Sequence, residues 1–416
     1  MALKIEVITI GDEILSGNIV DTNFAWIGDQ LWSRGYDLFW HTTVADDSER
    51  IREALLFAAQ RSQVVLVTGG LGPTTDDITL RSAAEAFGVA YEHSETAFHI
   101  VKRFFEKTGR EMSPNNRLQA FLPQGGEVME NDVGTAPGCH FHFQKTDFFF
   151  MPGVPQEMKP QVQNTVIPFL QKQSPSQFCY RFFRCYGLPE AQFDQKLRQV
   201  EALQKIPGLR LAYRVSFPEI FIKISSNEPG QAEARVVQAA QIIQEQIGAY
   251  IYAEGDNPIE KVVGQLLRER KQTLALAESC TGGFVSDKIT DVSGSSEYFE
   301  RGIVTYSNRS KIELLGVSEE LIAKHGAVSA EVALAMAAGI QKVSGTDYGI
   351  GITGIAGPTG ATADKPLGTV HIALAYPGGV KERKFQFFRD RHWFKVFTTH
   401  AALHILRRKI LGLGKD

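Results

Sequence analysis

Hydrophobic residues follow two alternating patterns in the first part of the chain, short apolar runs and longer amphipathic stretches. Runs at residues 3–10 and 64–68 predict buried strands, and stretches at 22–34 and 48–61 predict helices. This alternation favours a largely parallel sheet covered by helices on both faces. Both predicted strands lead into glycine, at the carboxyl edge where open α/β sheets bind ligands.

A polar stretch without periodicity, residues 171–177, interrupts this pattern, and its proline and lack of apolar spacing indicate a linker. The segment that follows is typical of a small α+β module. We expect a strand at 178–186, a helix at 189–203, two strands within 209–225 and a helix at 231–247.

A third unit begins after Pro258, because proline suits the first turn of a helix. Apolar runs predict its strands, at 273–277, 302–306, 348–353 and 370–376. Since 416 residues exceed what one hydrophobic core usually serves, we expect separate domains, at 1–172, 177–254 and 256–416.

Composition and charge narrow the class of protein. No apolar run is long enough to span a bilayer, and the chain starts directly with a strand pattern, so we expect a cytoplasmic protein without membrane contacts. The formal net charge of −3 gives no general attraction to nucleic acid. The four cysteines have no zinc spacing, so a structural metal and a disulfide framework are not expected.

The segment 277–283 carries the clearest chemical signal, because it brings Ser279, Cys280 and two glycines from a strand end to a helix start. Free amides of a first helical turn can hold a phosphate or an oxyanion. The serine needs a base, either histidine or a neutral lysine, whereas the thiol is a rival nucleophile because a helix N-terminus lowers its pKa. Taken alone, a serine at a strand end is more often a helix cap.

Two later strand ends can complete such a site. Residues 302–311 predict a strand leading into a helix that carries Tyr306 and Lys311, and residues 352–360 add Thr353 and a glycine-rich loop. A lone lysine of this kind is usually solvated. Together with Ser279, however, these residues form a constellation that favours nucleophilic catalysis.

The first unit shows a phosphate-binding pattern, because Gly69, Gly70 and Gly72 let the backbone approach an anion. Asp76 and Asp77 can hold a divalent cation beside it, or can instead favour a helix start through the helix dipole.

Three histidines are interpreted as structural. His140 and His142 share one strand face but lack an evident third metal ligand, and His325 is expected to cap or pack.

The chain resembles the competence/damage-inducible CinA family over essentially its whole length. Segments 277–283, 325–329 and 353–358 resemble the family's C-terminal domain, and 11–17, 68–74 and 134–138 resemble its molybdopterin-binding-like domain. The resemblance implies an α/β fold class with a molybdopterin-binding-like three-layer N-terminal domain, a KH-type α+β insert and an α/β C-terminal amidohydrolase domain.

The family includes nicotinamide mononucleotide deamidases, which release ammonia and nicotinate mononucleotide in pyridine nucleotide recycling. By this resemblance Ser279 is the nucleophile, Lys311 its general base and Tyr306 an orienting residue, with no cofactor. Arg389 competes with Arg391 for a substrate-contacting role, since both are expected on one strand face. The substrate-binding residues implied are Cys280, Thr281, Gly282, Gly283, Ser296, Thr353, Gly354 and Arg391.

The resemblance also implies a nucleotide site in the first domain, associated in some members with metal-dependent ADP-ribose pyrophosphatase activity. The divalent metal would lie at Asp76 and Asp77. The residues implied for the nucleotide are Asp12, Asn23, Gly69, Gly70, Gly72, Thr74, Gly134 and Thr135.

The expected partners are small nucleotides, nicotinamide mononucleotide and ADP-ribose, and a second copy in a homodimer. Between residues 178 and 255 no GxxG loop occurs, so the insert is expected to be structural or dimerising and not to bind nucleic acid. The alternative is a non-catalytic protein that senses nucleotides or binds partners in competence or DNA-damage responses.

Overall fold

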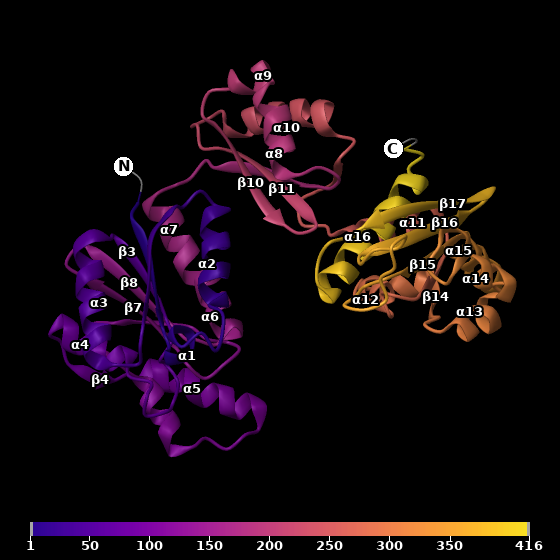
Figure 1. Cartoon of the computed structure of the whole chain (residues 1–416). Helices are drawn as coiled ribbons and strands as arrows, with labels where there is room; N and C mark the ends of the chain where they lie inside the picture. Colours follow the sequence, from indigo (N-terminus) through magenta and orange to yellow (C-terminus); the bar gives the residue numbers. More distant parts are fainter. Residues whose placement is uncertain (1–2, 414–416) are drawn as a thin grey trace. The chain divides into compact units, whose positions relative to one another are not determined.

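The structure is a computed structural model that describes residues 3–413 (Figure 1). By its internal contacts the chain divides into two compact units, residues 1–180 with 225–236 and residues 181–224 with 237–416. The expected domain limits remain predictions, and their outermost residues, 1–2 and 414–416, lie outside the described residues.

A six-stranded sheet is the centre of the first unit. Its first four strands run parallel and the last two antiparallel, so the expected largely parallel sheet has an antiparallel edge. The strands, in spatial order, are β2 (Leu38–Val44), β1 (Ile5–Ile10), β3 (Val64–Thr68), β8 (Thr146–Met151), β7 (Gly138–Phe143) and β6 (Glu127–Met129).

Helices cover both faces of this sheet, because alternate residues of its strands point to opposite sides. Ile8 and Val65 belong to one apolar core, and Val7 and Leu66 to the other. Helices packed on the first core are α3 (Ser48–Arg61), α4 (Thr79–Phe87) and α5 (Glu95–Thr108). Helices packed on the second are α2 (Thr22–Trp32), α6 (Pro155–Gln161), the π-helical η2 (Val162–Val166) and α7 (Ile167–Gln173). The expected three-layer arrangement is confirmed (Figure 1).

Short elements complete this part of the chain. They are α1 (Asp12–Leu15), the 3₁₀ helix η1 (Pro114–Ala120) and the strand pair β4 (Tyr91–His93) and β5 (Phe121–Pro123).

A four-stranded sheet forms the middle of the chain. Its strands, in spatial order, are β10 (Leu209–Ser216), β11 (Glu219–Ser226), β9 (Cys179–Cys185) and β12 (Ile251–Glu254). The helix expected at 189–203 is interrupted near Val200 and becomes α8 (Glu190–Arg198) and α9 (Glu201–Gln204), whereas the later expected helix is α10 (Ala232–Ile247).

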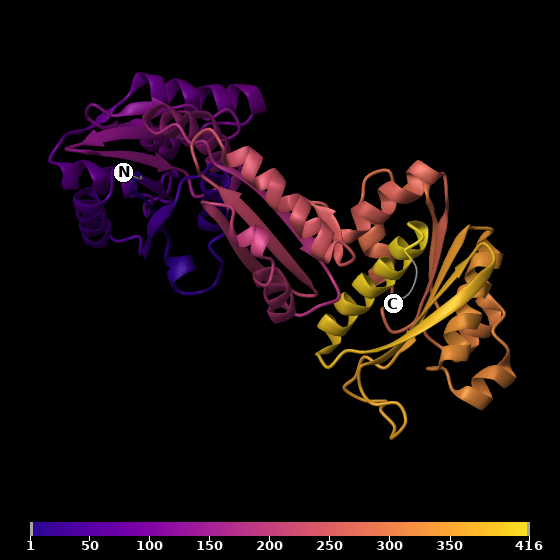
Figure 2. The same cartoon turned by 90° about the horizontal axis from the view of Figure 1, so that it is seen from above.

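A five-stranded sheet is the centre of the second unit. Its first three strands are parallel and the last two antiparallel. Figure 2 shows the orange and yellow strands of this sheet with the yellow C-terminal helix alongside. The strands, in spatial order, are β14 (Phe299–Val304), β13 (Leu274–Glu278), β15 (Tyr348–Gly354), β16 (Thr369–Tyr376) and β17 (Gly379–Gln386).

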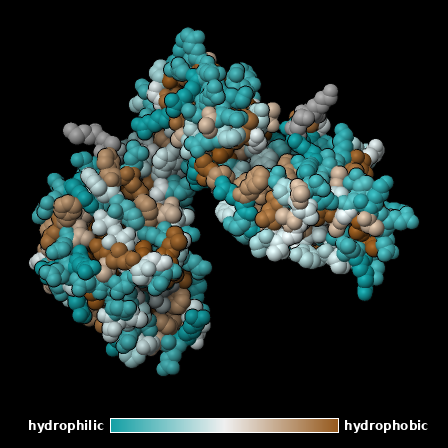
Figure 3. All heavy atoms as spheres, in the orientation of Figure 1, coloured by the Kyte–Doolittle hydropathy of each residue, from teal (hydrophilic) through white to brown (hydrophobic). Residues whose placement is uncertain are grey.

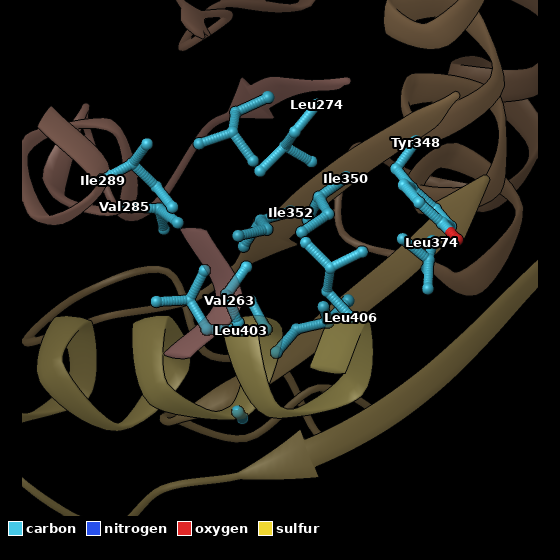
Figure 4. Close-up of a cluster of buried hydrophobic side chains, with 14 of the residues drawn as sticks. Val263, Leu274, Val285, Ile289, Tyr348, Ile350, Ile352, Leu374, Leu403 and Leu406 are labelled. Atoms are coloured by element: carbon cyan, nitrogen blue, oxygen red, sulfur yellow. The ribbon is translucent and has the colours of Figure 1, made fainter. Parts of the chain in front are cut away.

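One face of this sheet carries the larger apolar core. Figure 4 shows Leu274, Ile350 and Ile352 of the strands pointing toward Leu403 and Leu406 of a long C-terminal helix. The elements on this side are α11 (Ile259–Arg270), α12 (Phe284–Thr290), the 3₁₀ helix η3 (Ser295–Glu297) and α16 (Arg391–Ile410).

The opposite face is built from small residues, so that a helix can lie close to the strands. A Cβ atom added to Gly349 would lie 2.5 Å from the carbonyl oxygen of Ala337. One added to Gly351 would lie 2.5 Å from the amide nitrogen of Ala337. That helix is α15 (Ala330–Ser344), which is preceded by α13 (Asn308–Leu315) and α14 (Glu319–His325).

The surface mixes polar residues with apolar patches (Figure 3). Within residues 3–413, no helix combines the length and hydropathy that crossing a bilayer requires.

Candidate active site

Ser279 follows β13 directly and is held in a tight turn. Its amide donates to the carbonyl oxygen of Ile352 on β15, at 3.1 Å, and its own carbonyl accepts from the amide of Gly282, also at 3.1 Å. Gly282 and Gly283 have φ angles of 63° and 96°, which side-chain-bearing residues rarely adopt. The two glycines therefore allow the chain to turn sharply between the strand and α12.

Lys311 of α13 reaches Ser279 from the neighbouring strand end. Its Nζ lies 3.2 Å from Ser279 Oγ, 2.8 Å from the carbonyl oxygen of Thr305 and 3.3 Å from that of Tyr306. The Lys311 side chain is buried, with 1% of the residue exposed, and Ser279 is 8% exposed. The sequence places these residues 32 positions apart, and the parallel pairing of β13 with β14 brings them together.

Burial shifts the pKa values of the candidate base, Lys311, and of the rival nucleophile, Cys280. Burial lowers the pKa of Lys311, which increases its neutral, proton-accepting form. Burial raises the pKa of the Cys280 thiol to about 12, and the nearby Glu278 adds to that rise. Since the thiolate is the reactive form of cysteine, the structure favours Ser279 over Cys280 as the attacking group.

Glu278 occupies the start of α12, which sequence reasoning left free for a ligand. Its buried carboxyl group accepts from the amides of Gly283, Val285 and Ser286 at 3.0, 3.2 and 2.8 Å, and from the Ser286 hydroxyl at 2.6 Å. These amides therefore already have an acceptor before any substrate binds. The sequence signal for this role was a glutamate at the end of a buried strand, four residues before the first of two glycines.

Tyr306 and Arg391 form a bridge at the rim of the site. The two terminal guanidinium nitrogens of Arg391 donate to the carbonyl oxygen of Gly357 at 2.8 Å and to the Tyr306 hydroxyl at 3.0 Å. Arg391 is the first residue of α16, whose N-cap Asp390 accepts from the amides of His392 and Trp393. The strand that we expected for this segment is therefore wrong, because Asp390 caps a helix at that point.

Thr353 has a contact that positions the neighbouring segment. Its buried hydroxyl donates to the carbonyl oxygen of Ala327 at 2.8 Å, which holds residues 325–329 against the end of β15. Gly354 lies against β16, where a Cβ atom would meet the carbonyl oxygen of Thr369 at 2.7 Å. Ser296 is exposed on η3, and no hydrogen bond within residues 3–413 joins it to Ser279 or Lys311.

A second candidate site is a cavity of about 280 Å³ at the carboxyl edge of the six-stranded sheet. Of the residues implied for the N-terminal nucleotide, Asn23, Gly69 and Gly70 line it. The amide of Asn23 donates to the Thr68 hydroxyl and to the carbonyl oxygen of Gly153, whereas its buried Oδ1 has no partner in the part of the chain that the structure describes.

The cavity lining is acidic. It contains five carboxylic acids and, among the described residues that line it, no lysine, arginine or histidine; the acids are Glu13, Asp21, Asp46, Asp76 and Asp77. Burial raises the pKa of Asp46, and repulsion from Asp12, Glu13 and Asp76 raises it further. The sequence analysis did not assign Asp46 to this site. Its position just after the strand β2 was the signal that could have identified it.

The other residues implied for this site lie around the cavity. Asp12 donates its amide to Asp46 at 3.0 Å, and Gly72 and Thr74 line an adjacent hollow. Gly134 and Thr135 line neither hollow; the Thr135 hydroxyl instead accepts from the Gln119 side chain at 3.1 Å. The structure thus brings only part of the implied set to one cavity.

The described residues offer carboxylates to a metal ion but do not form a complete ligand set. Within residues 3–413, no three His, Cys, Asp or Glu side chains converge as a ligand set. The Asp77 carboxyl group accepts from the Thr74 amide at 2.8 Å, while a hydrogen bond from Thr74 lowers the pKa of the exposed Asp76. A cation would have to share one or two of these carboxylates with oxygen atoms of a ligand, as Mg²⁺ commonly does.

The histidines that we interpreted as structural contact carboxylates. Asp147 lies 3.0 Å from His140 Nε2 and 3.1 Å from His142 Nδ1, and His325 Nδ1 lies 3.2 Å from Glu331.

Comparison with known proteins supports the architecture. Residues 256–410 match the CinA C-terminal domain, and residues 6–172 match the probable molybdopterin binding domain. A CinA-like protein of Geotalea uraniireducens is 41% identical over 99% of this chain and 98% of its own length, and one of Geobacter sulfurreducens is 42% identical over 98% and 100%. The CinA crystal structure from Thermoplasma acidophilum is 36% identical over 40% of this chain and 98% of its own, with a TM-score of 0.37. The chain therefore belongs to the CinA family, as the sequence motifs indicated.

Proposed function

We propose that this chain hydrolyses the carboxamide of nicotinamide mononucleotide, giving nicotinate mononucleotide and ammonia. The observation that carries the proposal is the 3.2 Å contact between Lys311 Nζ and Ser279 Oγ inside a buried site. A buried lysine with a lowered pKa beside a serine hydroxyl is a pairing suited to acyl transfer from an amide.

The three contacts of Lys311 account for proton transfer in both directions. A neutral amine has two N–H bonds and one lone pair; the carbonyl oxygens of Thr305 and Tyr306 accept the two N–H bonds, which leaves the lone pair toward Ser279. When Lys311 takes the Ser279 proton, the resulting ammonium keeps the same three neighbours. The proton can therefore be gained and lost without rearranging the site.

The reaction then proceeds in two halves. Ser279 Oγ attacks the carboxamide carbon while Lys311 takes its proton, and Lys311 returns this proton to the departing nitrogen, which leaves as ammonia. Water next attacks the acyl-serine, with Lys311 as base again, and the carboxylate product leaves as Ser279 regains its proton.

The decisive experiment compares two neighbouring nucleophiles in the full chain. We expect Ser279→Ala to lower ammonia release from nicotinamide mononucleotide by about 10³-fold or more, because the attacking oxygen is gone. Cys280→Ser should keep most of the activity, since the thiol is buried and protonated. Full activity in Ser279→Ala would overturn Ser279 as the nucleophile. An inactive wild-type protein would overturn the deamidation itself and favour a nucleotide-sensing protein.

We also propose that the N-terminal cavity binds a nucleotide diphosphate such as ADP-ribose together with a divalent cation. The acidic lining supports this, because without a cation the five carboxylic acids would repel the diphosphate. The sequence predicted that Asp76 and Asp77 would hold the ion. We propose Asp76 together with Asp46, whose carboxyl groups repel each other, because Asp77 already accepts from the Thr74 amide. The bound ion would offset the negative charge of the phosphates. Release of ADP-ribose hydrolysis products by the full chain, abolished by chelator, is the expected result. Binding without hydrolysis would leave this domain as a sensor.

A further inference from the structure

The groups that normally bind an anion near Ser279 are already engaged in the structure. Glu278 accepts from the first amides of α12, and Asp390 accepts from the first amides of α16. Arg391 donates both terminal nitrogens to Gly357 and Tyr306. A phosphate that approached the helix amides would have to displace an existing acceptor. At Arg391 it could reach only the N–H bonds that Gly357 and Tyr306 leave unused.

Lys395 is the exception. It lies on α16 four residues after Arg391, so both side chains lie on one face of the helix. A Cβ atom added to Gly282 would lie 3.5 Å from Lys395 Nζ. Within residues 3–413, the Lys395 ammonium has neither a hydrogen bond nor an ion pair, although the side chain is partly buried.

The space beside that ammonium is open. Lys395 Nζ is the one described atom within 4 Å of a Cβ atom added to Gly282, when the two neighbours of Gly282 in the chain are left out. The turn from Ser279 to Gly282 is closed by a 3.1 Å hydrogen bond, so this space lies one tight turn from the proposed nucleophile. An anionic group in this space would contact the Lys395 ammonium. Among the described residues, no carboxylate is paired with that ammonium and would have to be displaced.

We propose that Lys395 binds the phosphate monoester of the substrate over Gly282 and thereby sets a preference for nucleotides over nucleosides. This inference rests on the proposed deamidation and assigns its phosphate recognition to a residue that the sequence motifs did not single out. Arg391 then acts as a positioning residue, because it holds Tyr306 and the Gly357 loop in place. Gly282 leaves the room that the phosphate needs.

The test measures kcat/KM of the full chain for nicotinamide mononucleotide and for nicotinamide riboside, which lacks the phosphate. Lys395→Gln should lower kcat/KM for the nucleotide by about 10- to 100-fold, mainly through KM, and leave the riboside unchanged, since one charge-assisted contact is lost. Lys395→Arg should retain most of the preference. Lys409→Gln, at the other end of α16, serves as the matched control. Equal losses on both substrates, or no loss on the nucleotide, would overturn the assignment.

A second measurement separates this proposal from the deamidation itself. Calorimetric titration with ribose 5-phosphate should show binding to the wild type and about tenfold or weaker binding to Lys395→Gln. If the wild type releases no ammonia but this difference remains, the deamidation fails and the phosphate site stands. If the two proteins bind ribose 5-phosphate equally, or neither binds it, the phosphate site is wrong. Unchanged melting temperatures of the variants show that folding is not the cause.

Discussion

The Ser279 turn and the N-terminal cavity both lie at carboxyl ends of parallel strands, yet they handle charge in opposite ways. In the first, the buried charged groups find partners within the chain: Glu278 binds four donors and Lys311 contacts three oxygen atoms. Among the described residues of this turn, the buried Thr281 hydroxyl has no partner. In the second, five carboxylic acids line an open cavity in which no basic residue of the described chain takes part. The first arrangement suits chemistry done by side chains alone, whereas the second suits a ligand that brings its own cation.

The largest effect is expected from Lys311, because the proposed deamidation depends on a base. Lys311→Arg should lower deamidation by about 10³-fold or more, since arginine stays protonated and cannot take the Ser279 proton. Lys342→Arg, on the exposed side of α15, is the control. A working Lys311→Arg enzyme would mean that only positive charge is needed there.

The pH dependence of kcat/KM also tests Lys311 as the base. The base acts in its neutral form, so kcat/KM should rise with pH as Lys311 loses its proton. Because burial lowers the pKa of Lys311, this rise should be centred below the ordinary lysine value of 10.5. A rate that falls with rising pH across this range would contradict the role of Lys311 as a base.

A smaller effect is expected on stability from Glu278. Glu278→Ala leaves three amides and a hydroxyl without their acceptor in a buried position, which should cost about 3–5 kcal/mol and lower the melting temperature of the second unit. The melting temperature of Glu278→Gln should lie between those of the wild type and Glu278→Ala. One carboxyl oxygen is replaced by an NH₂ group, which would face N–H or O–H donors and could not accept from them. Melting curves of the full chain, followed by far-ultraviolet circular dichroism, measure this. Equal melting of all three proteins would show that the helix start does not need the carboxyl group.

The smallest effect is expected at the N-terminal cavity. The folded-state pKa of Asp46 is raised, so its contribution to stability is present below the unfolded-state pKa and is lost as pH rises through the folded value. At neutral pH, Asp46→Asn should therefore stabilise the protein by at most about 1 kcal/mol. Added Mg²⁺ should raise the melting temperature of the wild type more than that of Asp46→Asn. The exposed Asp37→Asn is the control, and a Mg²⁺ effect identical in all three would exclude Asp46 from cation binding.

Several regular, buried elements were predictable because their apolar spacing is a local signal, although the buried strand β8 was missed. The helix at 48–61 and the strand at 64–68 have the predicted bounds in the structure. Strand β17 was missed because it lies at a sheet edge and its composition, rich in lysine, arginine and glutamate, gives little apolar signal. Strand direction was also beyond the sequence, since no local pattern distinguishes the antiparallel β16 from a parallel strand.

The candidate site was predictable where motifs name side chains and unpredictable where geometry decides their partners. Ser279 and Lys311 were expected together, and their 3.2 Å contact is consistent with that prediction. The occupied amides at α12 depend on Glu278 folding back from a buried strand, which requires the tertiary structure. Lys395 emerges only once residues 391–410 are known to be helical, because the spacing of four then places it beside Arg391.

The buried thiol of Cys280 has a consequence for resistance to chemical damage. Hydrogen peroxide and alkylating reagents attack the thiolate, and a thiol whose pKa is raised to about 12 carries almost none of that form at neutral pH. A proposed nucleophile that is a hydroxyl, next to such an inert thiol, would not undergo the oxidation that inactivates cysteine hydrolases. Under oxidising stress the proposed deamidation would therefore continue while thiol-dependent enzymes lose their nucleophiles.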